Sequence, residues 1–285
     1  MFNIKEACRS IDITKNSKYM IAAATTVGLQ FYDVTSGRRL CEVQVPGVNS
    51  KMVALNYGDT QVMCLYDNEK RSYIRSYRVE DCLAGNSAKE PQFEIQSSSD
   101  YLFTGAVWGP KNESIIISTN SGKVIYYDIL SNKIINEVQV HKGEIVTITL
   151  TYDYTMLMTG SKDGYAKLLH PETFKTIREF HYGKPVRTAS ISPLFDSDVH
   201  QKFHMIMGGG QDAKDVTTTD AAAGGFEMKI FNLIFGEKLV EIGGHFGPVH
   251  SICFSPDGFA FASGAEDGYV HYHRLPPEYF SKRFE

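Results

Sequence analysis

The chain has 285 residues, a net charge of −4 at pH 7, 12% aromatic residues and 24 glycines. No stretch of the sequence concentrates five or six Lys and Arg residues, which excludes the charge pattern of a dedicated nucleic-acid-binding protein. Aromatic residues and glycines in this proportion favour short strands joined by tight turns. The composition therefore predicts an all-β fold without direct, sequence-specific nucleic-acid binding.

Five cysteines are spread irregularly along the chain, and no Cys-x-x-Cys pair occurs. This spacing argues against a zinc site or a disulfide framework, so we expect reduced thiols and no metal. The first residues are polar and acidic where a signal peptide would be apolar, and no run of 18 apolar residues is present. We therefore expect a cytoplasmic protein that does not enter a membrane.

Six repeats run along the chain, and their clearest mark is the end of the third predicted strand, where a WD-type repeat has an aromatic residue followed by a polar one. The six positions are Tyr32, Tyr77, Tyr127, Leu169, Phe231 and His273. The pattern predicts a WD-repeat β-propeller that forms a single domain over 1–285. The predicted repeats span about 1–45, 46–97, 98–140, 141–180, 181–243 and 244–285.

Two features of the second and third repeats can be explained without a binding role. The polar stretch 81–99 is expected to be a solvated loop between repeats, which could include an outer strand at 93–95. Trp108 is the only Trp of the chain, and Trp is enriched in binding hot spots. Because it closes an apolar strand, we expect it in the core.

The fourth and the last repeats show the strand–turn–strand order most plainly. The fourth has predicted strands at 145–150, 156–159 and 165–169, and the last has them at 249–254, 259–263 and 270–272. In each, a His precedes the first strand, a hydroxyl residue lies on the second, and an Asp lies in the turn before the third. The two sets are His141, Thr159 and Asp163, and His245, Ser263 and Asp267.

Each His–hydroxyl–Asp set has two interpretations. It resembles a catalytic triad in composition, but it also suits a buried hydrogen-bond relay that fixes the turn between two strands. We favour the structural relay, because the arrangement repeats and because buried polar groups must be paired wherever they occur.

A long insertion separates the second and third strands of the fifth repeat. It begins with Gly208, Gly209 and Gly210, but no G-x-x-x-x-G-K-[ST] pattern or helix start follows, which argues against a phosphate-binding loop. Long loops on compact scaffolds are more often functional than idle. We predict a partner-binding loop that uses Asp212, Asp215, Thr217, Thr218 and Thr219.

His271 and His273 lie two residues apart on one predicted strand face, which is a spacing that two metal ligands could use. No third ligand is evident nearby in the sequence. We therefore expect both side chains to have structural roles and predict no metal site.

The insertion also carries a family resemblance. Gly-Gly-Gly-Gln-Asp-Ala-Lys-Asp-Val-Thr-Thr-Thr at 208–219, together with Gly-His-Phe-Gly-Pro at 244–248 and Ser-Pro-Asp-Gly at 255–258, resembles the family of subunit i of eukaryotic translation initiation factor three. Gly-Ala-Glu-Asp-Gly-Tyr-Val at 264–270 and Ala-Val-Trp-Gly-Pro at 106–110 support it. The resemblance is strong after about residue 101 and weak before residue 93.

The resemblance implies a non-catalytic, seven-bladed scaffold without a cofactor. Members of the family hold the C-terminal segment of the b subunit and contact the g subunit, and they reach the small ribosomal subunit indirectly during assembly and scanning. Since six repeats are visible here, the first family blade is expected to be missing from this sequence.

Two other classes of function remain as alternatives. A WD-repeat signalling scaffold of the receptor-kinase or G-protein β type would share the fold, but it has no need for the motif at 208–219. A propeller hydrolase or metalloenzyme would need carboxylates or His ligands that converge at the central channel. The turn aspartates instead lie at repeat-equivalent positions, so we expect no enzyme activity.

Overall fold

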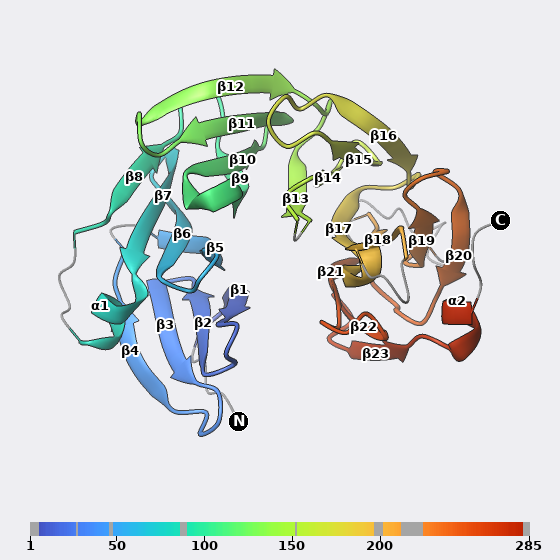
Figure 1. The fold of residues 1–285 in the computed structure, drawn as a ribbon, viewed down its shortest axis with the longest axis horizontal. Helices are drawn as coiled ribbons and strands as arrows, with labels where there is room; N and C mark the ends of the chain where they lie inside the picture. Colours follow the sequence, from blue (N-terminus) through green and yellow to red (C-terminus); the bar gives the residue numbers. More distant parts are fainter. Residues whose placement is uncertain are drawn as a thin grey trace. The chain divides into compact units, whose positions relative to one another are not determined.

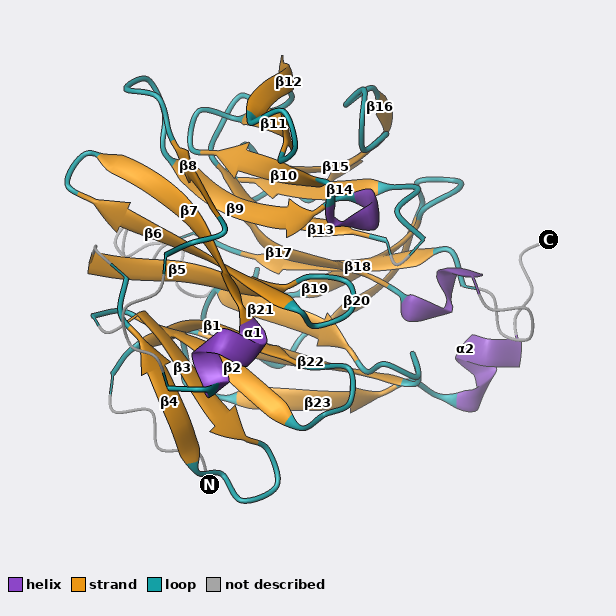
Figure 2. Ribbon diagram, turned by 60° about the vertical axis from the view of Figure 1, so that its left-hand side comes forward, coloured by secondary structure: helices purple, strands orange, loops and turns teal. Residues whose placement is uncertain are grey.

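The computed structural model describes residues 6–26, 28–45, 48–85, 90–151, 153–196, 202–211 and 225–281. Within these residues the chain forms six antiparallel sheets, and consecutive strands of each sheet are neighbours in space (Figures 1 and 2). The chain divides into two compact units, 1–138 and 139–285. The predicted all-β class with six repeats is confirmed, whereas the single domain over 1–285 stays a prediction.

Three four-stranded sheets make up the first unit, whose boundary falls at the end of β12. Its elements are β1 (Cys8–Ile13), β2 (Tyr19–Ala24), β3 (Gly28–Asp33), β4 (Arg39–Val43), β5 (Val48–Leu55), β6 (Gln61–Asn68), β7 (Arg71–Arg78), α1 (Val79–Leu83), β8 (Phe93–Gln96), β9 (Phe103–Trp108), a 3₁₀ turn (Pro110–Asn112), β10 (Ser114–Thr119), β11 (Lys123–Asp128) and β12 (Lys133–Gln139).

The second unit has two four-stranded sheets and one sheet in which three strands are described. Its elements are β13 (Ile145–Leu150), β14 (Leu157–Ser161), β15 (Tyr165–Leu169), β16 (Thr176–His181), β17 (Val186–Ile191), a 3₁₀ turn (Pro193–Asp196), β18 (His204–Gly209), β19 (Met228–Asn232), β20 (Lys238–Ile242), β21 (Val249–Phe254), β22 (Ala260–Ala265), β23 (Val270–Arg274) and α2 (Pro277–Ser281).

The six positions that mark the repeats in the sequence all lie on the third strand of a sheet, namely on β3, β7, β11, β15, β19 and β23. The stretch 81–99 differs in part from the expectation. It contains the end of α1 and β8, so the predicted outer strand at 93–95 is confirmed. The part before β8 joins the third and fourth strands of one sheet, and only the part after β8 leads to the next sheet. Among the described helices none has the length and apolar character needed to cross a bilayer.

Several second strands are buried along their whole length. Every residue of β10 (Ser114–Thr119) and of β18 (His204–Gly209) is buried. A strand covered on both faces reads as a continuous apolar run rather than as an alternating one. Trp108 confirms its predicted core position, since it is 6% exposed and its indole Nε1 donates to the carbonyl oxygen of Ala54 at 3.1 Å.

Close packing of successive sheets explains a glycine that recurs on the second strand. A Cβ at Gly160 would lie 2.7 Å from Cγ1 of Val186 in the next sheet, and one at Gly208 would lie 3.1 Å from Cβ of Val249. Gly264 holds the same register position on β22, but a Cβ there would meet nothing within 4 Å. Within the described residues of the second unit, no side chain or backbone packs against the Cβ position of Gly264.

This difference predicts the effect of two matched substitutions. Gly208→Ala is expected to lower the free energy of unfolding by about 1–3 kcal/mol, because the added methyl group overpacks the contact with Val249 and Ile252. Gly264→Ala is the control and should cost less than about 0.5 kcal/mol or stabilise the chain slightly. Urea unfolding followed by circular dichroism measures both, and equal losses at the two positions would contradict the packing argument.

Candidate functional site

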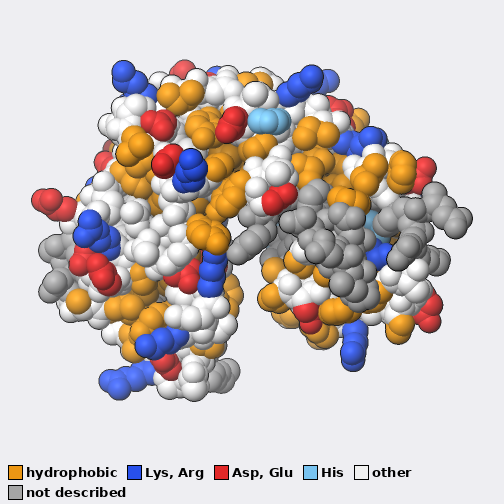
Figure 3. Space-filling model, viewed as in Figure 1, with side chains coloured by type: hydrophobic (Ala, Val, Ile, Leu, Met, Phe, Trp, Pro, Cys, Tyr) orange, Lys and Arg blue, Asp and Glu red, His pale blue; other side chains and the backbone are white. Residues whose placement is uncertain are grey.

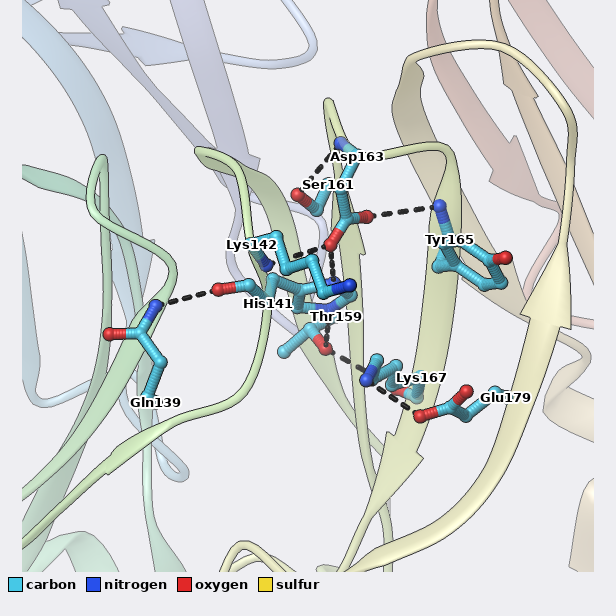
Figure 4. A network of polar contacts seen from close by, with 9 residues as sticks. All are labelled: Gln139, His141, Lys142, Thr159, Ser161, Asp163, Tyr165, Lys167 and Glu179. Atoms are coloured by element: carbon cyan, nitrogen blue, oxygen red, sulfur yellow. Dashed lines mark hydrogen bonds and ion pairs between the residues drawn. The ribbon is translucent and has the colours of Figure 1, made fainter.

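The first predicted relay is assembled around His141, which is 2% exposed (Figure 4). Its Nδ1 lies 3.0 Å from Oδ2 of Asp163 and its Nε2 lies 2.9 Å from Oγ1 of Thr159. Because a carboxylate only accepts hydrogen bonds, Nδ1 donates to Asp163 and Nε2 is left to accept from the Thr159 hydroxyl. The strand β14 supplies Thr159, and the turn that follows it supplies Asp163.

Local backbone geometry holds Asp163 in place. The amide of Lys142 donates to Oδ2 at 3.0 Å and the amide of Tyr165 donates to Oδ1 at 3.1 Å. The turn closes at Gly164, whose φ of +88° favours glycine. One aspartate therefore ties the segment before β13 to the turn between β14 and β15.

A second relay repeats this geometry in the sheet β21–β23. His245 Nδ1 lies 3.0 Å from Oδ2 of Asp267, and its Nε2 lies 2.8 Å from Oγ of Ser263. The amides of Phe246 and Tyr269 both donate to the Asp267 carboxylate at 2.9 Å. The same backbone contacts occur in both relays, so the structure brings together each set of three residues that the sequence singled out.

Electrostatics favour a neutral imidazole at His141 and ionised carboxylates at Asp163 and Asp267. Burial lowers the pKa of His141 and outweighs the opposing effect of Asp163. Burial would raise the pKa of Asp163, but His141 and the amide of Lys142 outweigh it and the pKa is lowered. The amides of Phe246 and Tyr269 are the main cause that lowers the pKa of Asp267 to about 2.

Burial also limits what the relays can do chemically. Thr159 is 0% exposed and Ser263 is 1% exposed, so neither hydroxyl is accessible to a substrate from solvent. Within the described ranges, no group of three or more His, Cys, Asp or Glu side chains is arranged to hold a metal ion. His271 stacks on His245 with ring centroids 4.2 Å apart, and His273 stacks on Phe261 at 4.6 Å.

The predicted partner-binding residues Asp212, Asp215, Thr217, Thr218 and Thr219 lie outside the described residues.

The glycines that precede this segment are described, and they have a packing role. A Cβ at Gly209 would lie 2.0 Å from the carbonyl oxygen of Pro185, and one at Gly210 would lie 2.8 Å from the ring of Phe226. The glycine run is therefore explained by close backbone approach and does not need a phosphate ligand.

Sequence reasoning missed a polar contact that extends the first relay outward. Lys167 on β15 forms an ion pair with Glu179 on the outer strand β16, with 2.6 Å between Nζ and Oε1 (Figure 4). Lys167 also lies beside the relay, since its carbonyl oxygen is 3.4 Å from Oγ1 of Thr159. The sequence signal for this ion pair is a Glu in the outer strand of each four-stranded sheet. It can be assigned to a partner only when the pairing register of the third and fourth strands is known.

Surface charges are mixed in sign. On the face seen in Figure 3, Lys and Arg side chains are interspersed with Asp and Glu side chains. Many of them pair across neighbouring strands, as Lys123 does with Glu137 at 2.6 Å. The described side chains on this face form no extended basic patch for a phosphate backbone.

The first relay can be tested by deleting its central residue. His141→Ala is expected to lower the free energy of unfolding by about 2–3 kcal/mol, because it leaves the buried Thr159 hydroxyl and the Asp163 carboxylate without their partner. His250→Ala is the matched control, since this half-exposed side chain faces Glu266 at 3.7 Å, and it should cost less than about 0.5 kcal/mol. Equal losses of unfolding free energy for His141→Ala and His250→Ala in chemical denaturation would contradict the structural role of the relay.

The second relay predicts a dependence on pH. The folded-state pKa of Asp267 is about 2, below the value of about 3.9 for an unfolded chain. Its ionised form therefore stabilises the fold above about pH 4, and this contribution is lost as the pH falls toward 2. Asp267→Asn should destabilise the chain at pH 6 and progressively less at pH 4 and pH 3, as measured by urea unfolding. A loss of unfolding free energy in Asp267→Asn that stays constant from pH 6 to pH 3 would contradict the stabilising role assigned to the ionised carboxylate.

Comparisons with known proteins agree with these features. The family model EIF3I matches residues 3–285. The chain is 32% identical over 277 residues to eukaryotic translation initiation factor 3 subunit I of Mus musculus and of Homo sapiens, covering 96% of this chain and 82% of each relative. It is 31% identical to the Bombyx mori protein of the same name over 281 residues, with the same coverage.

A solved structure extends the likeness to the fold. A chain in the crystal structure of the mitotic checkpoint complex superimposes with a TM-score of 0.73 and 14% identity, covering 96% of this chain and 76% of that one. At this identity the likeness concerns the fold alone, and with the six antiparallel sheets it identifies a β-propeller of the WD-repeat type. The match over nearly the whole chain shows that it belongs to the family of subunit I of eukaryotic translation initiation factor 3.

Proposed function

We propose that the chain is a non-catalytic scaffold subunit of the translation initiation factor 3 complex. In this role it docks the C-terminal segment of the b subunit and the g subunit while the pre-initiation complex assembles and scans in the cytoplasm. Contact with the small ribosomal subunit is indirect. The observation that carries the proposal is family membership over residues 3–285.

Two structural observations support a scaffold over an enzyme. The hydroxyl groups of both relays are buried, and their His and Asp partners also hold backbone turns, so the sets have a structural explanation. The same relay occurs in two sheets with identical sequence spacing, whereas a catalytic centre is needed only once. The family match also removes the reason to prefer a receptor-kinase or G-protein β type of signalling scaffold.

The partner-binding surface is assigned to the insertion between β18 and β19. Its residues Asp212, Asp215, Thr217, Thr218 and Thr219 carry short polar side chains, which suit hydrogen bonds to a partner segment. The insertion starts from a rigid base, because Gly208 and Gly209 pack tightly against neighbouring strands. A loop presented by a rigid scaffold is the usual location of a binding surface.

A charge reversal tests this assignment. Asp215→Arg is expected to leave the fold intact and to reduce recovery of the b and g subunits about tenfold or more when the tagged chain is purified from cells of its own source, since a cation replaces the acceptor at the contact. Glu237→Arg is the control, because it makes the same charge change at an exposed position in the β19–β20 turn.

Mass spectrometry of the recovered proteins measures the result, and circular dichroism verifies folding. Unchanged recovery with Asp215→Arg would remove the insertion from the docking surface. Failure of the unaltered, folded chain to recover any subunit of the complex would overturn the proposed function itself.

A further inference from the structure

The connection between the third and outer strands is unusual in the sheet β5–β8. A short turn joins these two strands in the other four-stranded sheets, but here the connection contains the helix α1. This helix packs against β4, which is the outer strand of the preceding sheet (Figure 1). The connection therefore bridges two sheets of the first unit.

Hydrogen bonds fix both ends of this bridge. The amide of Val79 donates to the carbonyl oxygen of Thr60 at 3.0 Å, where the helix begins. After the helix, the side chain of Gln92 accepts from Nε of Arg78 at 3.2 Å, and its amide donates to the carbonyl oxygen of Ser76 at 2.8 Å. The position of α1 beside β4 is thus set by the fold around it.

Three of the five cysteines gather at the joint between these two sheets. Cys64 and Cys82 belong to the apolar core that residues of both sheets form, and Cys41 of β4 packs against that core. All three are present as thiols. Cys41 and Val43 face the core together, because alternate residues of a strand point to the same side. Residues that are distant in the sequence therefore meet at one place in the fold.

Cys41 and Cys82 come from the two elements that meet at this joint. Cys82 lies on the buried side of α1, where it is 2% exposed. Cα atoms of α1 approach those of β4 to within 8 Å. Since a disulfide spans a Cα separation of about 4.4–6.8 Å, the two backbones approach closely enough for a disulfide bond to join them.

Burial divides the three cysteines by their access to an oxidant. Cys41 is half-buried, whereas Cys64 is 0% exposed and burial raises its pKa to about 12. Because the thiolate is the reactive form of a cysteine, Cys64 is protected from oxidation in the folded chain. Cys41 is therefore the thiol of this group that an oxidant reaches first, and Cys82 lies on the helix that contacts its strand.

We propose that Cys41 and Cys82 form an oxidisable pair, which a hydroperoxide converts into a disulfide between β4 and α1. The Cys41 thiol attacks a peroxide oxygen, and the O–O bond breaks to give a sulfenic acid and, from hydrogen peroxide, one water. The Cys82 thiol then attacks the sulfenic sulfur, so that the S–S bond forms and a second water leaves. The two thiols lose two electrons and two protons in total, and a dithiol reductant reverses the change.

The disulfide joins the outer edge of the first sheet to the second sheet. It closes a loop that contains β5, β6 and β7, and a closed loop of this length restricts the unfolded chain. Oxidation is therefore expected to stabilise the first unit without a change of fold. The proposal does not rest on the docking role, because neither cysteine lies on the insertion between β18 and β19.

Peptide mapping tests the pairing. The full chain is treated with hydrogen peroxide, its remaining thiols are blocked with N-ethylmaleimide, and a non-reducing tryptic digest is analysed by mass spectrometry. Oxidation should join the peptide 40–51, which contains Cys41, to the peptide 79–89, which contains Cys82. The joined species should weigh two hydrogen atoms less than the two peptides together, and dithiothreitol should separate it.

Single substitutions show which thiols are needed. Cys41→Ala and Cys82→Ala should each abolish the joined peptide. Cys253→Ala is the matched control, because it removes an exposed thiol of the second unit, and it should leave the yield of the joined peptide unchanged. If Cys82→Ala fails to fold by circular dichroism, Cys41→Ala at its half-buried position still decides the question.

A thermal shift tests the structural consequence. Oxidation should raise the Tm of the unaltered chain by about 5 °C or more, and it should not raise the Tm of Cys41→Ala. A disulfide between Cys64 and Cys82 would overturn the assignment of the pair, and so would a disulfide between two copies of the chain. Conversion of Cys41 to a sulfinic acid while Cys82 stays reduced would overturn the proposal, as would a folded, peroxide-treated chain that gains no disulfide.

Discussion

Burial of the second strands on both faces is the constraint on which the rest of this structure depends. The second strands β10 and β18 are buried at every residue, so their sequences must be apolar or have internally satisfied polar groups. Sheets that cover such strands approach closely, and this leaves room only for glycine at Gly160 and Gly208. The sheet β21–β23 shows the converse, because Gly264 has open space above it.

The same constraint explains why a His–hydroxyl–Asp set is repeated. Turns between packed strands leave backbone amides that need acceptors. A partly buried Asp satisfies two of them at once, as Asp163 and Asp267 do. His141 and His245 then connect each carboxylate to a hydroxyl on the second strand. Composition alone suggested catalysis, but the burial of the hydroxyls and the repetition assign the sets to the fold.

Sequence predicted the features that depend on local spacing. The turn aspartates lie at the same distance after His141 and His245, and third-strand positions such as Tyr127 and His273 end a recurring strand–turn–strand pattern, so they could be placed on the correct strands. The Lys167–Glu179 pair could not be predicted, because it depends on the register of an outer strand that has no turn signature. The packing role of Gly209 was also hidden, since its neighbour Pro185 is distant in sequence.

Edge protection distinguishes β23 from the outer strands of the other sheets. An exposed edge is usually protected from further pairing by charged residues, as β20 is by Lys238 and Glu241. β23 instead reads Val-His-Tyr-His-Arg, with exposed Val270 and Tyr272 and a single full charge at its end. Its composition is that of a strand paired along both edges. In the four-stranded sheets the charged side chains therefore concentrate on the outer strands, where they limit further pairing, as on β16 and β20.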